Sequence, residues 1–225
     1  MPQGLTPNQR YIQIAFNGTI QQVRRILPRI RYDPRIWIEA GTPFIKREGT
    51  RGINLIRRMW RGVVVADLKV TDGAIDEVNF AVNAGASAVT AMGSSPVATL
   101  NRFIAACNAR NVYSMIDMLG VSDPLKKMQP LKMKPDCVVI HKGRDEESVA
   151  RSIIRYKDIS KIRSKYDVFI SVAGGIVPLR VRTAYFNGAD IVILNVVKST
   201  DENEGINENS NFEQLIPQIL SEVGN

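Results

Sequence analysis

The stretch Val63-Val-Val-Ala-Asp67 is an apolar run that ends abruptly in a carboxylate. Four consecutive hydrophobic residues without alternation are typical of a strand that is buried on both faces, as in a parallel sheet. A helical pattern follows at Ile75–Ala84, then a second apolar run at Ala88–Ala91 and a second helical pattern at Val97–Ala109. Gly85 stands where a helix C-cap would fall. This order predicts parallel strands joined by crossover helices.

The same alternation of short apolar runs and amphipathic stretches extends along the chain. A further helical pattern covers Ser148–Tyr156, and Asn111 and Gly188 stand at other C-cap positions. The runs that fit buried strands are Tyr11–Phe16, Ile36–Ala40, Val63–Asp67, Ala88–Ala91, Val112–Asp117, Cys137–His141, Val168–Val172 and Ile191–Asn195. Strand followed by helix, repeated eight times, predicts an α/β fold of the (β/α)8 TIM-barrel class. An open doubly wound sheet is the alternative that sequence order alone does not exclude.

No long linker divides the chain, so we expect residues 1–225 to form a single (β/α)8-barrel domain. The 225 residues are close to the ~250 that are typical of such a barrel. The polar segment Ser199–Asn211 is expected to be a mobile loop before a final helix at Phe212–Val223.

Composition places the chain among ordinary globular proteins, with 44% hydrophobic and 23% charged residues. No apolar run reaches the ~18 residues needed to span a bilayer, so no membrane contact is expected. The N-terminus shows no basic stretch followed by an apolar core, as a signal peptide would. Cys107 and Cys137 have no metal-ligand spacing and indicate two buried, reduced thiols. These features favour a cytoplasmic location.

The net charge of +8 raises the question of a nucleic-acid partner. Arginines cluster at Arg24-Arg25, Arg29, Arg31, Arg35, Arg47, Arg51, Arg57-Arg58 and Arg61. No nucleic-acid motif and no aromatic ladder accompanies them, so we interpret them as solvated outer faces of helices. A basic surface also attracts phosphorylated metabolites, and a nucleic-acid partner is not expected.

Polar residues stand at the ends of the predicted strands, where barrel enzymes collect their functional groups. They are Asn17, Glu39, Asp67, Asp117, His141, Gly174-Gly175 and Asn195. Asp and Asn also start turns and cap helices, so any one of these positions has a purely structural interpretation. Several such positions together favour a site.

The segment Asp67-Leu-Lys69-Val-Thr-Asp72 places two carboxylates around a lysine. In a strand, Asp67 and Lys69 point to the same side because the side-chain period is two. If that side is the mouth of the barrel, a carboxylate keeps Lys69 charged and oriented. A surface salt-bridge network would have the same pattern.

These motifs resemble those of the orotidine-monophosphate-decarboxylase superfamily, and within it those of the 3-hexulose-6-phosphate synthases. Asp67-x-Lys69-x-x-Asp72 resembles the superfamily signature. Further similar stretches, in the family's order, are Ile38–Gly49, Ala66–Gly73, Val89–Gly93, Ile116–Pro124, His141–Asp145 and Val172–Ile176. Together they cover most of residues 11–197.

The resemblance implies an activity and a cofactor. Glu39 stands where the synthase and the related 3-keto-L-gulonate-6-phosphate decarboxylase carry glutamate, whereas the decarboxylase that makes uridine monophosphate carries lysine there. Those two branches use magnesium and form a 1,2-enediolate from a sugar phosphate. By resemblance, Glu39 and Asp67 would be the Mg²⁺ ligands, which suits a hard cation that takes carboxylate oxygens.

Further roles follow from the resemblance. Lys69 would hydrogen-bond oxygens of the substrate or intermediate. Asp72 would reach the neighbouring subunit's site across a homodimer interface. His141, the only histidine of the chain, ends a predicted strand before a glycine-containing turn and is the candidate proton carrier. Asp117 is a supporting candidate in the catalytic group.

The expected phosphate site lies after the seventh strand, where Gly174 and Gly175 are expected to open a helix with free backbone N–H groups. A tight strand-to-helix turn is the structural alternative.

Four positions depart from the family pattern. Asn17 replaces the usual aspartate after the first strand. Asn195-Val196 replaces glycine followed by arginine or a small residue after the eighth strand, and Lys198 is a hypothetical substitute in the phosphate cradle. Arg144 resembles the keto-gulonate-phosphate branch.

Three hypotheses therefore remain. The first is an aldehyde-lyase that interconverts ribulose 5-phosphate plus formaldehyde with D-arabino-3-hexulose 6-phosphate. The second is a sister enzyme that decarboxylates a β-keto-acid sugar phosphate, which Arg144 favours. The third is a non-catalytic barrel that binds a phosphorylated ligand or a polyanion, which Asn17 and Asn195-Val196 favour.

Overall fold

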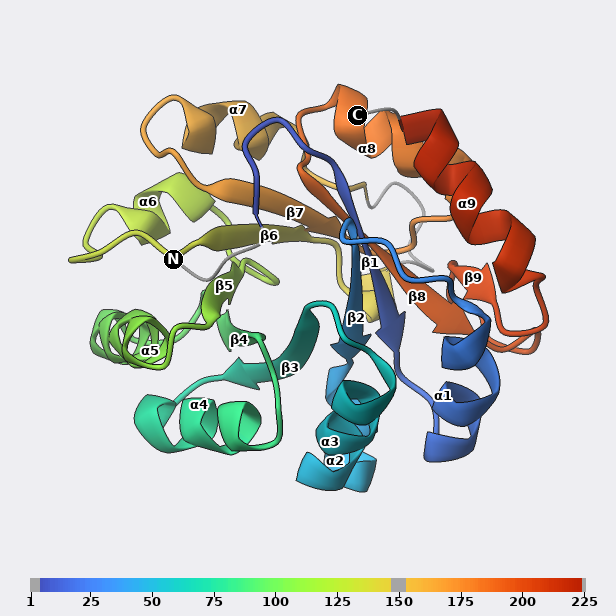
Figure 1. Ribbon diagram of the computed structural model, residues 1–225. Helices are drawn as coiled ribbons and strands as arrows, with labels where there is room; N and C mark the ends of the chain where they lie inside the picture. Colours follow the sequence, from blue (N-terminus) through green and yellow to red (C-terminus); the bar gives the residue numbers. More distant parts are fainter. Residues whose placement is uncertain (1–4, 147–152, 224–225) are drawn as a thin grey trace.

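The computed structural model describes residues 5–146 and 153–223, and in them parallel strands close into a barrel (Figure 1). Each strand pairs with the next in sequence, and the first also pairs with the eighth. The barrel strands are β1 (Tyr11–Phe16), β2 (Ile36–Ala40), β3 (Val64–Val70), β4 (Ala88–Met92), β5 (Tyr113–Asp117), β6 (Cys137–His141), β7 (Phe169–Ala173) and β8 (Ile191–Val197). The closing pairing confirms the (β/α)8 barrel and excludes the open doubly wound sheet.

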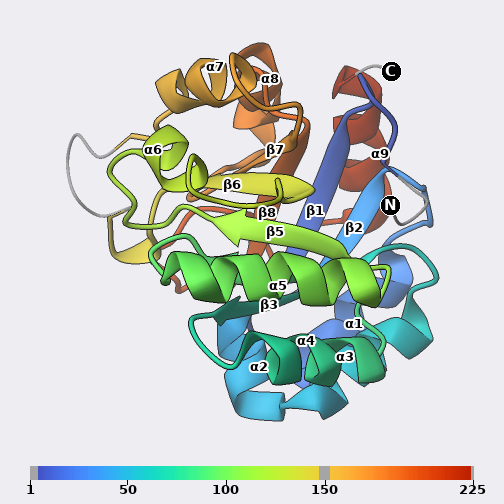
Figure 2. The same ribbon diagram turned by 90° about the vertical axis from the view of Figure 1, so that its left-hand side faces the viewer.

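Helices surround the strands, and Figure 2 shows α3, α4 and α5 side by side along one flank. The α-helices are α1 (Ile20–Ile26), α2 (Thr42–Glu48), α3 (Thr50–Met59), α4 (Ala74–Asn83), α5 (Val97–Ala109), α6 (Pro124–Met128), α7 (Lys157–Arg163), α8 (Val181–Phe186) and α9 (Phe212–Val223). Short 3₁₀ helices are η1 (Leu27–Arg29), η2 (Arg144–Glu146) and η3 (Pro178–Arg180). Within the described ranges, no helix is long and apolar enough to cross a membrane.

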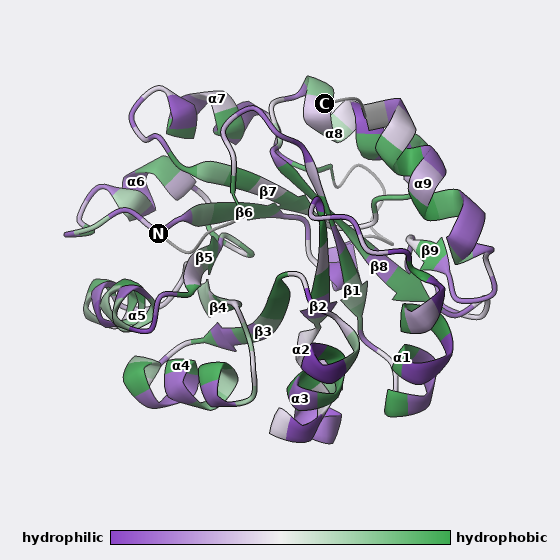
Figure 3. Ribbon diagram, viewed as in Figure 1, coloured by the Kyte–Doolittle hydropathy of each residue, from purple (hydrophilic) through white to green (hydrophobic). Residues whose placement is uncertain are grey.

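The strands bury both faces, which explains why their sequences are apolar without alternation. The outward face packs on the helices, while alternate residues fill the barrel interior. The hydropathy colouring of Figure 3 shows strands that are largely hydrophobic and helices that contain both hydrophobic and hydrophilic residues. Inside the barrel, the Trp37 ring stacks on the Tyr113 ring, with the ring centroids 5.4 Å apart. Large apolar side chains thus close one end of the barrel.

The expectation for the cysteines is confirmed, whereas the expectation of solvated arginines on helix faces holds for only some of them. Cys107 and Cys137 are buried, free thiols. Arg24 on α1 and Arg51 on α3 are exposed, whereas Arg57 is half-buried and donates to the Trp60 and Gly62 carbonyls.

The helix predicted at Ser148–Tyr156 is wrong where it can be compared. Residues 147–152 lie outside the described ranges, residues 153–156 are not helical, and α7 begins at Lys157. The Arg155 guanidinium donates to the carbonyl oxygens of Val121, at 2.8 Å, and Ser122. These bonds tie the segment to the loop after β5, and the helix starts only beyond them.

The loop expected at Ser199–Asn211 contains a short strand, β9 (Ile206–Asn207), that pairs in parallel with β8. Ile206 is the apolar exception in this polar segment, and burying its side chain against the barrel favours the strand. Glu208 forms a 2.8 Å ion pair with Arg25 on α1. The segment is therefore fastened to both β8 and α1.

Candidate active site

Strand β3 is irregular where it presents Asp67 and Lys69. Ala66 pairs with Val89 and Val70 with Ala91, so four steps on β3 lie opposite two steps on β4. Lys69 has the left-handed φ of 51°, which is unusual for a residue other than glycine. Its backbone N–H donates to Thr90 Oγ1 over 2.9 Å. Asp67 and Lys69 face the same cavity as expected, but a bulge rather than unbroken strand alternation arranges them.

Asp67 is held by neutral donors and by the lysine. Thr42 Oγ1 lies 2.7 Å from Asp67 Oδ2, and Thr90 Oγ1 lies 2.7 Å from Asp67 Oδ1. Lys69 Nζ lies 3.3 Å from Asp67 Oδ1. These contacts fix the Asp67 carboxylate at the C-terminal end of the barrel strands.

Lys69 also contacts Asp117, which in turn holds His141. The Lys69 ammonium donates to Asp117 Oδ2, and His141 Nδ1 lies 2.8 Å from the same oxygen. The three side chains come from β3, β5 and β6 and form a continuous hydrogen-bonded chain. Asp117 is 2% exposed, so these contacts act in a low-dielectric environment.

The charges of Lys69, Asp117 and His141 influence one another's protonation. Burial opposes the charged form of each group, but the opposite charges outweigh it. Asp67 and Asp117 raise the pKa of Lys69 despite its burial, and His141 and Lys69 hold the pKa of Asp117 well below its usual range. Asp117 likewise raises the pKa of His141. Lys69 therefore stays a cation, and His141 gains protons more readily than a free imidazole.

Glu39 lies beside Asp67 on the neighbouring strand. Its side chain is buried and accepts a hydrogen bond from Gln13 Nε2. Burial and the Asp67 charge raise the pKa of Glu39 to about 8. Two adjacent carboxylates in a buried site favour either a shared proton or a cation.

These groups line one cavity of about 300 Å³ at the C-terminal end of the strands. Of the residues predicted from the sequence, the cavity brings together Asn17, Glu39, Asp67, Lys69, Asp117, His141, Arg144 and Asn195. Asn17 and Asn195, which both differ from the family pattern, contact each other: Asn17 Nδ2 donates to Asn195 Oδ1 over 3.1 Å. A larger hollow of about 830 Å³ opens at the opposite end of the barrel, but it contains none of these groups.

The remaining predicted site residues lie outside the cavity lining. Lys198 is exposed, and its backbone N–H donates to Asp201 Oδ2 over 2.9 Å. Asp72 is also exposed, beyond the end of β3. Gly174 and Gly175 follow β7 with positive φ, but η3 begins only at Pro178, so the expectation that they open a helix is wrong. A Cβ on Gly174 would lie 2.3 Å from the Lys142 carbonyl oxygen, so close packing on the loop after β6 requires this glycine.

The model of the Orotidine 5'-phosphate decarboxylase / HUMPS family matches residues 18–203. The chain belongs to this family. The resemblance read from the sequence motifs is thus confirmed over most of the barrel.

Individual family members are also similar to the chain. A bifunctional enzyme Fae/Hps from Methanocella arvoryzae is 37% identical over 188 residues, which are 82% of this chain and 48% of that protein. A 3-hexulose-6-phosphate synthase from Salmonella typhimurium has a TM-score of 0.77 at 26% identity, covering 93% of this chain and 100% of that one. A 3-keto-L-gulonate-6-phosphate decarboxylase from Vibrio cholerae, with a TM-score of 0.67 at 21% identity, covers 95% and 100% and shares the fold. The chain spans about half the length of the curated relatives it matches.

Four polar residues of the cavity were not predicted from the sequence: Gln13, Thr42, Lys46 and Thr90. Gln13 and Thr90 are polar residues inside otherwise apolar strands, and this signal was available. Thr42 and Lys46 lie on α2, beyond the strand end, where sequence alone gives no direction for a side chain.

The donor set fits a magnesium ion of the kind the family resemblance implies. Mg²⁺ takes one or two carboxylates and completes its shell with waters and substrate oxygens. Glu39 and Asp67 supply two carboxylates, and a cation beside them would relieve the repulsion that raises the pKa of Glu39. Within residues 5–146 and 153–223, no group of three or more His, Cys, Asp or Glu side chains is arranged to hold a metal. As the family resemblance implies, Glu39 and Asp67 would be the carboxylates that hold the ion.

Proposed function

We propose that this chain is a magnesium-dependent aldehyde-lyase that interconverts ribulose 5-phosphate plus formaldehyde with D-arabino-3-hexulose 6-phosphate. The observation that carries the proposal is the single cavity in which the Glu39–Asp67 pair adjoins the Lys69–Asp117–His141 chain. The similarity to a 3-hexulose-6-phosphate synthase supports it. The buried free thiols suit a reducing compartment such as the cytoplasm.

The reaction needs a carbanion equivalent at C1 of the ketose phosphate. Magnesium held by Glu39 and Asp67 would stabilise negative charge on substrate oxygens as the C1 proton leaves. Lys69 stays protonated, so it donates hydrogen bonds to the same oxygens and does not act as the base. C1 of the enediolate then forms a bond to the formaldehyde carbon, and the formaldehyde oxygen takes up a proton to become a hydroxyl.

His141 is the group that moves protons in this scheme. Its Nδ1 bonds to Asp117, and within the described ranges no hydrogen bond engages Nε2. Nε2 can therefore take the proton from C1 and return one to the new hydroxyl. Asp117 stabilises the imidazolium that forms between the two transfers.

The phosphate is assigned to the open end of the cavity. The backbone N–H groups at Gly174 and Gly175 remain candidates, because glycine allows close approach of an anion there. Lys198 lies away from the cavity lining, whereas the exposed cations Lys46 and Arg144 belong to it. We propose that Lys46 and Arg144 bind the phosphate and neutralise its charge.

The second candidate is decarboxylation of 3-keto-L-gulonate 6-phosphate, which Arg144 in the cavity lining favours. Both reactions begin at the same enediolate, so the products separate them. Hexulose phosphate formed from ribulose 5-phosphate and formaldehyde would support the lyase. Release of CO2 from the keto-gulonate phosphate without that condensation would support the decarboxylase. Neither product from folded protein would leave the binding role suggested by the Asn17–Asn195 pair.

The acid side of the pH–rate profile should report His141. The imidazole must be neutral to take a proton, and Asp117 raises its pKa above the usual 6.5. With saturating Mg²⁺, which competes with the proton on Glu39, kcat/KM should rise about tenfold per pH unit up to that raised pKa. Asp117→Asn removes the stabilising charge and should move this limb to lower pH. A limb that stays in place in Asp117→Asn would contradict the role of His141.

We also propose a homodimer in which Asp72 reaches the partner's cavity. Asp72 is exposed two residues before α4, and α4 exposes Ile75 and Phe80, which are 53% and 61% accessible. Such apolar exposure next to a charged residue suits an isologous contact. Asp72→Asn and Lys69→Met homodimers should both be inactive.

Mixing these two variants tests the arrangement. If Asp72 acts in the partner's site, each mixed dimer has one intact site, and random reassociation should restore about a quarter of the activity. If Asp72 acts in its own subunit's site, mixing restores nothing. Sedimentation of the mixture verifies that the subunits have exchanged.

A further inference from the structure

The Glu39 carboxylate is held by fewer groups than its neighbour Asp67. Asp67 accepts hydrogen bonds from Thr42 and Thr90, each over 2.7 Å. In the described part of the chain, the Glu39 side chain has one hydrogen-bond partner, the amide of Gln13. Glutamate is also the longer side chain, and the Asp67 charge repels it. Without Gln13, nothing among these contacts would keep Glu39 in place.

Gln13 is an unusual residue for its position. It lies in the middle of β1, is 1% exposed, and is the polar residue of an otherwise apolar strand. Its register partner on β2 is Trp37, two residues before Glu39, so Gln13 and Glu39 share the inner face of the barrel. Its Oε1 is buried and has no hydrogen-bond partner within the described ranges. An amide oxygen that is buried without a partner lowers the stability of the fold, a cost that an apolar side chain would avoid.

The amide is oriented as a cation-bound Glu39 requires. A carboxylate that holds a cation is ionised and only accepts hydrogen bonds, and Gln13 turns its NH₂ end toward Glu39 and its oxygen away. The bond goes to Glu39 Oε2, and Glu39 Oε1 remains available to a cation in the cavity. A polar residue that is kept at a cost to stability is typical of a functional position.

We propose that Gln13 is a positioning residue that fixes the Glu39 carboxylate for metal binding. The inference rests on the proposed function, which makes Glu39 a magnesium ligand. Gln13 acts through Glu39, as groups that hydrogen-bond metal-ligating carboxylates do.

The chain offers a matched control in Gln22 on α1. Gln22 is 6% exposed, donates from Nε2 to Glu208 Oε2 over 2.9 Å, and also has a buried Oε1 without a partner in the described part. Its hydrogen bonding thus repeats that of Gln13, but it does not line the cavity. Gln13→Met and Gln22→Met should therefore change thermal stability to a similar extent.

The test is the affinity of the full chain for Mn²⁺, measured by electron paramagnetic resonance without substrate, and for Mg²⁺ by competition. Gln13→Met is expected to weaken both about 10- to 100-fold, whereas Gln22→Met should leave both unchanged. Gln13→Asn keeps the amide but withdraws it by one methylene, and it should show the same loss. This variant also serves if Gln13→Met does not fold.

Catalysis provides a second readout that a purely structural role would not move. The lost rate of Gln13→Met should return as Mg²⁺ is raised in proportion to the weakened affinity. Unchanged Mn²⁺ affinity in both Gln13 variants would overturn the inference, as would an equal loss in Gln22→Met. Because the titrations contain no sugar phosphate, this outcome is distinct from a failure of the proposed reaction.

Discussion

Replacing Lys69 with methionine is expected to lower the rate of C1 proton exchange in ribulose 5-phosphate by about a thousandfold. Lys69 is the cation between Asp67 and Asp117, and both carboxylates raise its pKa so that it stays charged. Methionine has a similar length but offers neither charge nor hydrogen-bond donors. The enediolate oxygens then lose a charged donor in a buried site. The measurement is the exchange rate by NMR at saturating substrate and Mg²⁺.

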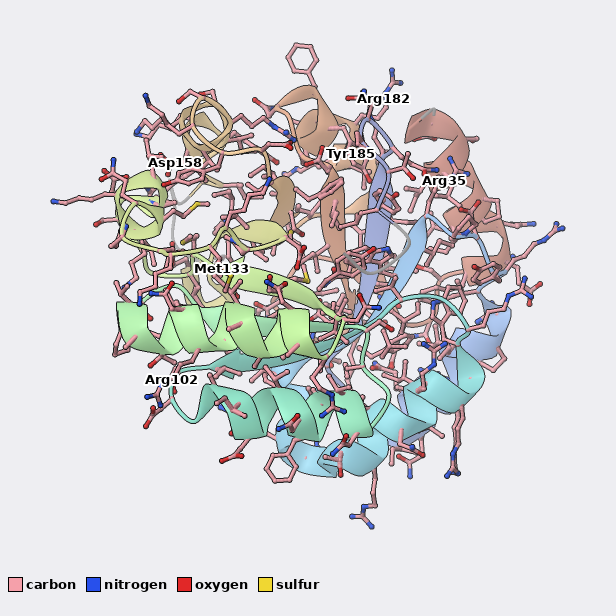
Figure 4. All side chains as sticks on the ribbon, turned by 60° about the vertical axis from the view of Figure 1, so that its left-hand side comes forward. Arg35, Arg102, Met133, Asp158, Arg182 and Tyr185 are labelled. Atoms are coloured by element: carbon pink, nitrogen blue, oxygen red, sulfur yellow. The ribbon has the colours of Figure 1, made fainter. Side chains whose placement is uncertain are left out.

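The same substitution should also destabilise the fold, because it leaves buried carboxylates without their cation. We expect a loss of about 3 kcal/mol in the free energy of unfolding. Lys161→Met is the control, since it removes one of two cations from the buried Asp158: Lys161 Nζ lies 3.2 Å from this carboxylate, and Arg155 also pairs with it. In the same way, Lys69→Met leaves His141 beside Asp117. Asp158 lies in α7 in the outer ring of helices (Figure 4). A control that loses as much activity as Lys69→Met would show that the effect is loss of folding rather than of chemistry.

Replacing His141 with glutamine is expected to lower the same rate by about 10²- to 10⁴-fold. Glutamine can still donate a hydrogen bond to Asp117, but it cannot take a proton from carbon. Affinity for Mn²⁺ should be unchanged, because His141 is not among the proposed ligands. The acid limb of the pH–rate profile should disappear together with the rate.

A His141→Gln variant that exchanges the C1 proton at nearly the wild-type rate would contradict the proposed role. The base would then have to be another group in the cavity. Lys69 is a poor alternative, since it holds its proton more tightly than a free lysine.

The barrel could be predicted because its strands carry a strong local signal. Apolar runs that end in Glu39, Asp67, Asp117 and His141 mark both the strands and the end at which function collects. The helix predicted at Ser148–Tyr156 was wrong at residues 153–156 because apolar periodicity does not reveal tertiary ties. The Arg155 guanidinium competes for this segment by binding carbonyls 34 and 33 residues away in sequence.

The site was predictable only in part. Lys69 was placed correctly for an incomplete reason, since the bulge in β3 depends on its pairing with β4. Lys198 is not part of the cavity lining, because β8 continues to Val197 and Lys198 follows the end of that strand. Gln13 was overlooked although a lone glutamine in an apolar strand is itself informative. The contact between Asn17 and Asn195 depends on the closure of β1 against β8, which no local pattern encodes.

The proposed reaction begins with magnesium-assisted loss of the C1 proton. The decisive experiment is exchange of that proton in ribulose 5-phosphate with deuterium from the solvent, followed by NMR with Mg²⁺, with excess EDTA, and with formaldehyde added. Exchange that requires Mg²⁺, with hexulose phosphate appearing when formaldehyde is present, is the predicted result. Folded protein that neither exchanges the proton nor condenses formaldehyde would contradict an enediolate-forming site at Glu39, Asp67 and Lys69.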